Sequence, residues 1–206
     1  VYLNGEYAGL YLLCEKNEIH PERMDISRKG SFLISMETES RLQAQKIPYV
    51  TLGTPQALRI RYASMSDEQL HQIWLRLSRA LSAADGVDPT SGKHWQELID
   101  LDSWVKKYLI EEIFANMDGN RLSQFFYMDG GDPSGKIIAG PVWDYDFALG
   151  GEAYWMCNFP SYMIMGKTYR EDEIILPMFY ELNAKPDFQK RLAEIYEETY
   201  LPELEK

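Results

Sequence analysis

Two carboxylate-bearing turns flank a short predicted β-hairpin near the middle of the chain, and this arrangement constrains the fold more than any other feature. A helical pattern leads into the turn Asp118-Gly119. Strands are predicted at Gln124–Met128 and Lys136–Ala139, and the carboxylates Asp144 and Asp146 follow the second strand. Loops that a rigid scaffold positions are where binding and catalytic side chains concentrate. The sequence therefore predicts a cleft lined by these two turns.

The spacing of the carboxylates indicates a cation site. In the extended stretch Trp143–Asp146 side chains alternate, so Asp144 and Asp146 are expected on one side and Tyr145 on the other. With Asp118 facing them, these carboxylates would repel one another unless a cation or protons lay between them. Mg²⁺ or Mn²⁺ is the natural occupant, because hard divalent ions prefer oxygen ligands. Each piece alone is ordinary turn chemistry, and only the order and spacing of the pieces indicate a site.

The first third of the chain is rich in predicted strands. Val1–Leu3 and Tyr7–Glu15 flank Asn4-Gly5, a strong signal for a type I′ hairpin turn, and alternation in the second strand predicts that it is largely buried. Ser31–Met36 and Ala57–Tyr62 are further strand candidates. The polar segment between them, residues 37–55, is predicted to be a turn-rich excursion.

The remainder is rich in predicted helices. Ser66 opens a helix with apolar residues at a period of about 3.6, and Asp100 or Asp102 caps a second one. Two more helices are predicted near Glu171–Leu182 and Asp187–Tyr200. Strands followed by helices predict an α+β protein with two unequal lobes.

Composition excludes several classes of function. The chain has 206 residues, enough for one sizeable core, and a formal net charge of −11 with a pI near 4.8, which argues against a nucleic-acid partner. No apolar stretch approaches the roughly 18–20 residues that cross a bilayer, so no membrane span is expected. Cys14 and Cys157 lack metal-site spacing, and buried free thiols are expected, with a disulfide between them as the alternative.

Three blocks of sequence are distinctive: VYLNGEYAGLYLLCEK at Val1–Lys16, NMDGNRLSQFFY at Asn116–Tyr127 and GPVWDYDFALG at Gly140–Gly150. Together they resemble successive parts of the CotH family of spore-coat, kinase-fold phosphotransferases. The three blocks occur in the family's order, with intervals compatible with one domain, and the last 55 or so residues add little to the likeness.

The resemblance implies a divergent, reduced protein-kinase-like fold. Residues 1–206 would form a single CotH-kinase-like domain that is truncated at its N-terminus, because the chain opens inside a hairpin without Met. Residues 1–62 would be the remnant of a small strand-rich lobe, and residues 63–206 a helical lobe carrying the active-site hairpin. Family members act on spore-coat proteins, which implies an extracellular, cell-envelope or spore-coat location in a bacterium.

The resemblance also assigns roles to the carboxylates, with ATP and Mg²⁺ or Mn²⁺ as cofactors and a protein Ser or Thr hydroxyl as acceptor. Asp118 matches the catalytic-loop Asp, which orients the acceptor hydroxyl and takes its proton. Asp144 matches the metal-binding Asp of the kinase DFG motif, with Asp146 as an auxiliary.

Two departures from the family pattern concern the nucleotide. The Asn that completes the metal site five residues after the catalytic Asp is here Ser123, with Gln124 beside it. A phosphate-binding loop and a strand Lys are absent upstream, so Glu15 and Lys16 are the only local candidates for nucleotide contact. Both departures bear on the activity of this chain more than on its fold.

Other functions are compatible with the same residues. A non-catalytic module for surface attachment or for assembly of the spore coat or cell envelope is favoured by Ser123 and by the aromatic stretch Tyr154–Tyr169. A glycosyltransferase would use Asp144 and Asp146 for Mn²⁺, but no βαβ pattern lies upstream. A glycosidase would use Asp118 and Asp144 as its acid/base pair, and the separation of the two carboxylates would test this.

Overall fold

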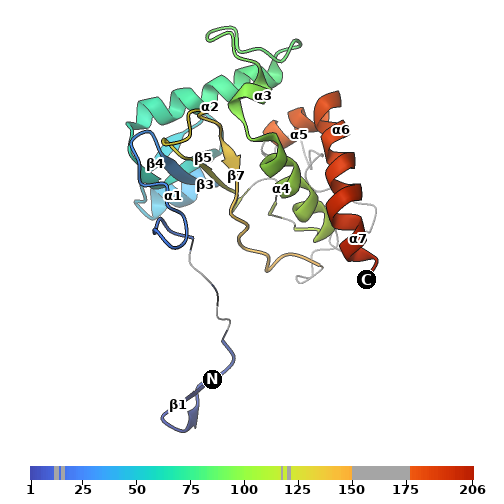
Figure 1. Cartoon of the computed structure of the whole chain (residues 1–206). Helices are drawn as coiled ribbons and strands as arrows, with labels where there is room; N and C mark the ends of the chain where they lie inside the picture. The colour runs from blue at the N-terminus through green and yellow to red at the C-terminus, as the bar shows by residue number, and fades with distance from the viewer. Residues whose placement is uncertain (12–13, 15–16, 117, 120–121, 150–176) are drawn as a thin grey trace.

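A five-stranded antiparallel sheet with helices packed beside it forms the body of the molecule (Figure 1). The computed structural model describes residues 1–11, 14, 17–116, 118–119, 122–149 and 177–206. The strand order is β4-β5-β3-β6-β7. The strands of this sheet are β3 (Phe32–Thr38), β4 (Tyr49–Thr51), β5 (Gln56–Ala63), β6 (Phe125–Met128) and β7 (Ile138–Ala139).

Strand β3 lies at the centre of the sheet and connects distant parts of the sequence. It pairs with β5 on one side and with β6 on the other, and it is buried from Phe32 to Glu37. Its alternate residues Phe32, Ile34 and Met36 pack into the core between the sheet and the helices, while Leu33 faces the opposite side of the sheet. The hairpin β6–β7 thereby continues the sheet that the first third of the chain begins.

The helices lie in chain order between and after the strands. They are α1 (Glu39–Ala44), α2 (Asp67–Ser82), α3 (Trp95–Leu98), α4 (Leu101–Ile113), α5 (Pro177–Asn183), α6 (Pro186–Ile195), the π-helix η2 (Tyr196–Tyr200) and α7 (Leu201–Leu204). Ser66 and Gln69 form a capping box at the start of α2, and the Asp100 carboxylate caps α4 by accepting from the Ser103 amide. The mixed α+β class and both predicted helix starts are confirmed.

The two faces of β6 look into different clusters of apolar side chains. Phe126 packs against Trp104 of α4, with ring centroids 4.9 Å apart, and Trp104 contacts Phe179 of α5 at 5.3 Å. These rings belong to the main core between the sheet and the helices. Phe125 points to the other face, where it joins a smaller cluster with Leu33. Alternation along β6 therefore fixes which side chains reach each face.

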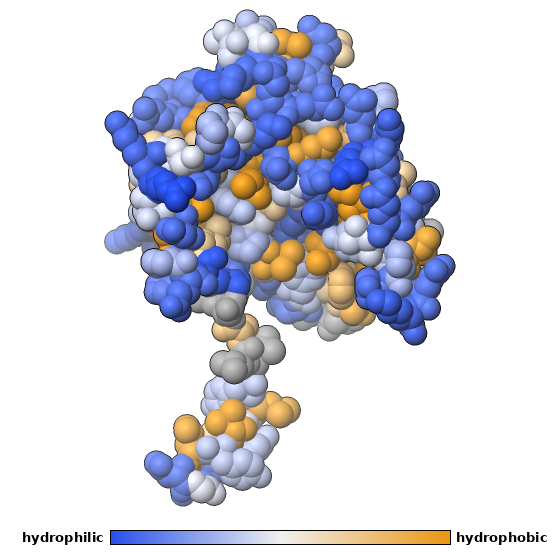
Figure 2. All heavy atoms as spheres, viewed as in Figure 1, coloured by the Kyte–Doolittle hydropathy of each residue, from blue (hydrophilic) through white to orange (hydrophobic). Residues whose placement is uncertain are grey.

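The N-terminal hairpin forms as predicted, but its predicted burial is wrong. Strands β1 (Tyr2–Leu3) and β2 (Glu6–Tyr7) pair across Asn4-Gly5, both of which have positive φ. The hairpin lies apart from the body, and hydrophobic residues are visible along it in Figure 2. The second strand ends at Tyr7, and Leu10 is 94% exposed. An alternating pattern predicts a strand, but burial of that strand depends on other segments that pack over it.

Several further expectations need correction or fall wholly or partly outside the described residues. The segment 37–55 is not an irregular excursion, since it holds the rest of β3, α1 and β4. Cys14 is exposed rather than buried. Of the helix predicted at 171–182, the structure describes α5 from Pro177, while Cys157 and the aromatic stretch 154–169 lie outside the described residues. No helix in the described ranges is long and apolar enough to cross a membrane.

Candidate functional site

The loop that carries Asp118 begins where helix α4 ends. Ala115 adopts a positive φ of 47°, which turns the chain away from the helix axis. Asp118 lies in the turn that follows, is partly buried, and accepts a hydrogen bond from the Leu122 amide at its backbone carbonyl, at 3.0 Å. The Ser123 amide then donates to the carbonyl of Met36 on β3, at 2.9 Å. The loop is therefore held at one end by α4 and at the other by the central strand.

Ser123 and Asp144 meet, although 21 positions separate them in the sequence. The Ser123 hydroxyl donates to Oδ2 of Asp144 at 2.9 Å. The Ser123 side chain comes from the turn before β6, and Asp144 comes from the segment after β7. Because β6 and β7 form a hairpin, the two ends of this hairpin lie side by side and bring the residues together. The structure thus joins two of the residues that the sequence assigned to the metal.

Asn116 bridges the two carboxylate-bearing loops. Its Nδ2 lies 3.5 Å from the carbonyl oxygen of Asp144, and its Oδ1 accepts from the Asp118 amide at 3.4 Å. The Asn116 side chain is fully buried. Sequence reasoning gave Asn116 no role, and its position two residues before Asp118 was the only available signal. The Asn116 side chain therefore contacts the backbones of both Asp118 and Asp144.

Left-handed backbone conformations gather in these two loops. Ala115, Ser123, Asp144 and Leu149 have φ between 47° and 66°, whereas the other non-glycine residues described with positive φ, Asn4 and Lys46, lie elsewhere. Such conformations persist only where surrounding contacts enforce them, and they concentrate at functional sites. Both partners of the Ser123–Asp144 hydrogen bond are in this group. This backbone strain is a second indication that the two loops form a site.

The donor set at Asp144 fits a hard divalent cation that retains other ligands. Ser123 Oγ and Asp144 Oδ2 are oxygen donors, the kind that Mg²⁺ and Mn²⁺ select, and Mg²⁺ usually takes only one or two carboxylates together with water and phosphate oxygens. Within the described part of the chain, no three His, Cys, Asp or Glu side chains gather as a cluster that could hold a metal. The expected group of three facing carboxylates is therefore not found there, and a metal would need ligands from a bound phosphate.

The remaining residues predicted for the site lie outside this group of contacts. Exposure alternates from Val142 to Asp146, so that Asp144 and Asp146 are exposed while Trp143 and Tyr145 are partly buried. No described contact joins Asp146 to Ser123 or Asp144. Glu15 and Lys16, the predicted nucleotide contacts, lie outside the described residues.

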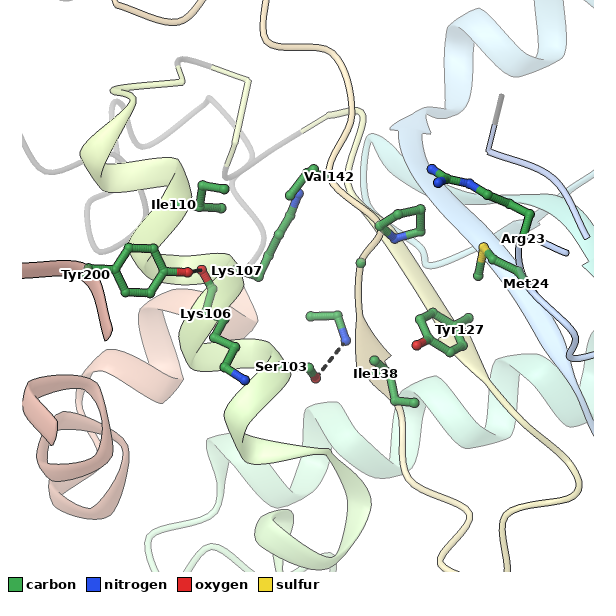
Figure 3. A pocket seen from close by; sticks show the side chains of 13 residues that line it. Arg23, Met24, Ser103, Lys106, Lys107, Ile110, Tyr127, Ile138, Val142 and Tyr200 are labelled. Atoms are coloured by element: carbon green, nitrogen blue, oxygen red, sulfur yellow. Dashed lines mark hydrogen bonds between the residues drawn. The ribbon is translucent and has the colours of Figure 1, made fainter. Parts of the chain in front are cut away.

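A cavity of about 450 Å³ lies beside the segment that leads to Asp144 (Figure 3). Helix α4 forms one wall, and the start of the Asp144 segment with Tyr127 forms the other, while the Ser103 hydroxyl accepts from the Ala139 amide across the base. Burial raises the pKa of Tyr127, and the charges of Asp100 and Asp129 add to this effect. The cavity is lined by Arg23, Met24, Ser103, Lys106, Lys107, Ile110, Tyr127, Ile138, Ala139, Gly140, Pro141, Val142 and Tyr200. Three of these side chains are basic and none is acidic.

In this α+β body, the β6–β7 hairpin brings Asp144 and the Ser123 hydroxyl together beside the loop that carries Asp118. The family model described as "CotH kinase protein" matches residues 1–206, the whole chain. The chain therefore belongs to the CotH kinase family, as the three sequence blocks indicated. No curated protein and no solved structure matches the chain. The family implies a kinase-like fold.

Proposed function

We propose that this chain carries an ATP-dependent phosphotransferase site of the CotH kind, which transfers the γ-phosphate to a Ser or Thr hydroxyl of a protein with the help of Mg²⁺ or Mn²⁺. The observation that carries the proposal is the contact of one buried side chain, Asn116, with the backbones of both Asp118 and Asp144. Family membership supports the class of reaction. It also supports a location at the spore coat or the cell envelope, outside the cytoplasm.

The two Asp residues have different roles in this proposal. Asp118 accepts the proton of the attacking hydroxyl and orients it, while Asp144, with Ser123 beside it, supplies oxygen ligands for the metal. A divalent cation held by Asp144 and Ser123 would neutralise charge on the ATP phosphates. Ser123 acts where the family has Asn, and its hydroxyl both orients Asp144 and offers a second hard donor.

The cavity supports an anionic substrate near this site. The net charge of −11 would repel ATP over most of the surface. Exposed Arg23 and Lys106 place positive charge at the cavity, which also includes Pro141 and Val142 shortly before Asp144. A local basic region in an acidic protein favours an anion there over other parts of the surface.

The test separates the two Asp residues by what each loses. In Asp118→Asn, we expect phosphate transfer to fall by at least about 100-fold, with Mg-ATP affinity unchanged, because the general base is removed and the metal ligands remain. In Asp144→Ala, we expect metal-dependent ATP affinity to be lost. Affinity is measured by titration calorimetry, and transfer by labelled phosphate on a Ser-containing protein acceptor. Asp67→Asn, on the first turn of α2, is the matched control for a lost carboxylate.

The alternative is a non-catalytic module of the same family, for surface attachment or for assembly of the coat or envelope. The replacement of the family's Asn by Ser123 favours it, because Ser123 already occupies one oxygen of Asp144. Such a module would show no Mg-ATP binding in the wild-type chain. An active Asp118→Asn variant would remove that residue from the mechanism, and unchanged affinity in Asp144→Ala would contradict the metal assignment.

A further inference from the structure

A fully buried carboxylate, Glu111 of α4, lies beneath the two loops of the candidate site. Its Oε2 accepts from Asn116 Nδ2 at 2.7 Å, and its Oε1 accepts from the Tyr145 hydroxyl at 2.8 Å. The ammonium of Lys107, one helical turn earlier, lies 2.6 Å from the same Oε1. Glu111 therefore contacts the bridging Asn116 on one side and the neighbour of Asp144 on the other.

The loop that carries Asp118 packs tightly against Glu111. Gly119 approaches so closely that a Cβ on this residue would lie 2.6 Å from Glu111 Oε2 and 2.9 Å from the Asn116 carbonyl oxygen. Only glycine fits a contact of this length. Glu111 and the Asn116 carbonyl together therefore favour glycine after Asp118, and Glu111 links the helix to the loop sterically as well as through hydrogen bonds.

The hydrogen bonds of Asn116 form a directional chain. Its amide nitrogen donates to Glu111 and faces the carbonyl of Asp144, so its amide oxygen is free to accept from the Asp118 N–H. A hydrogen-bond donor on residue 111 would face the amide nitrogen of Asn116, which is also a donor. Turning the Asn116 amide over would relieve that conflict but would set its nitrogen against the Asp118 N–H. A carboxylate at 111 is the group that satisfies every partner.

A second contact ties the same two segments together above Glu111. The Leu149 amide donates to the carbonyl of Phe114, at 2.8 Å, where α4 ends. The rings of Phe114 and Tyr145 pack edge to face, with centroids 6.0 Å apart. The segment 144–149 is therefore docked on the end of α4, with the Glu111–Tyr145 hydrogen bond beneath it.

We infer that Glu111 is a positioning residue, which sets the placement of Asp118 and Asp144 through Asn116 and Tyr145. This inference deepens the proposed function and rests on it for the catalytic readout. Outer groups that orient metal ligands typically change metal affinity or activity by about 10- to 100-fold when removed. A purely structural buried ion pair would change stability without this specific effect.

The experiment compares Glu111→Gln with two other variants of the full chain. Glu111→Gln is expected to weaken Mg-ATP affinity by about 10- to 100-fold in calorimetry and to lower the melting temperature. Lys107→Met combined with Glu111→Gln removes both charges, so the melting temperature should recover while the affinity does not. Asp88→Asn weakens the buried pair with Arg79, away from the site, and should lower the melting temperature with wild-type affinity.

Amide hydrogen exchange gives a readout that needs no nucleotide. In Glu111→Gln, the Asp118 and Leu149 amides should exchange faster than in the wild type, and in Asp88→Asn they should not. If the wild-type chain binds no Mg-ATP, the proposed function fails, and exchange alone decides the role of Glu111. Wild-type exchange at both amides in Glu111→Gln overturns the inference. So does recovery of affinity together with stability in the double variant, because Glu111 would then act through stability alone.

Discussion

Two ion pairs in this molecule, Lys107–Glu111 and Arg79–Asp88, each contain a fully buried carboxylate, but the surroundings of the two carboxylates differ. The side chains of Glu111 and Asp88 are both 0% exposed. The cation partner of Glu111, Lys107, is 1% exposed, whereas Arg79, the partner of Asp88, is 34% exposed. Glu111 connects two loops of the candidate site, while Asp88 holds its own loop to helix α2. Burial of a charge alone therefore does not mark a functional residue, and its connections do.

The two pairs also differ in how their charges are compensated. Burial lowers the pKa of Lys107, and Glu111 opposes that effect by its charge and its hydrogen bond. The hydrogen bond from Arg79 lowers the pKa of Asp88 against its desolvation, with further help from Ser91, which donates from both its hydroxyl and its amide. Asp88 keeps partners when Arg79 is lost. Glu111 would keep only neutral ones without Lys107.

The largest effect on stability is expected for Lys107→Ala. This change leaves the Glu111 carboxylate buried without a countercharge, and breaking a buried pair from one side costs about 3–5 kcal/mol. Urea unfolding monitored by tryptophan fluorescence measures the free energy of unfolding. A loss below about 1 kcal/mol would mean that water reaches Glu111 in solution, and the contrast between the two pairs would fail.

A smaller loss is expected for Arg79→Ala. The cation is partly exposed, and the Asp88 carboxylate retains its hydrogen bonds from Ser91 at 2.6 and 2.9 Å. A hydrogen bond to a charged group contributes about 1.5–3 kcal/mol, so the loss should lie in that range. The same urea titration gives the value, with Arg76→Ala on the same helix as control. A loss equal to that of Lys107→Ala would show that the extra partners of Asp88 do not matter.

Acid should affect the Asp88 pair. Because its pKa in the folded state is lowered from the ordinary value of 3.8, its contribution is complete above about pH 4 and is lost as the pH falls through the folded-state value. Asp88→Asn should therefore flatten the fall in melting temperature below pH 4. Thermal unfolding followed by circular dichroism from pH 6 to pH 2 measures this. Parallel curves for the two proteins would contradict the assignment.

The smallest change in stability is expected at alkaline pH, and it concerns Tyr145, whose hydroxyl donates to Glu111. Burial raises the pKa of Tyr145 above its ordinary value of 10.0, and the charge and hydrogen bond of Glu111 add to this. The unfolded chain then loses the Tyr145 proton before the folded chain does, so stability falls as the pH rises above 10. Tyr145→Phe should make this fall shallower. Melting curves from pH 8 to pH 11, with Tyr2→Phe in the exposed hairpin as control, provide the comparison.

The sequence predicted much of the fold where local signals are strong. The hairpin turn at Asn4-Gly5 follows from the positive φ that these residues tolerate, and Ser66 with its capping box indicates where α2 begins. The strands predicted at Gln124–Met128 and Lys136–Ala139 located the site hairpin to within two residues at each strand end. For the candidate site, the sequence and the family resemblance selected Asp118, Ser123 and Asp144. Their catalytic roles stay predictions.

Other features needed the tertiary structure, because they depend on contacts between distant segments. Alternation in residues 7–13 predicted a buried strand, yet burial requires a covering layer that no local pattern encodes. The sequence of α4 gave Glu111 no role and no partner, although this residue is fully buried while Glu112 is partly exposed. The role of Asn116 likewise arises from the fold, since it depends on the hairpin bringing Asp144 back to the end of α4. Periodicity and turn chemistry are local and determined the elements, whereas the fold decided which polar groups became partners.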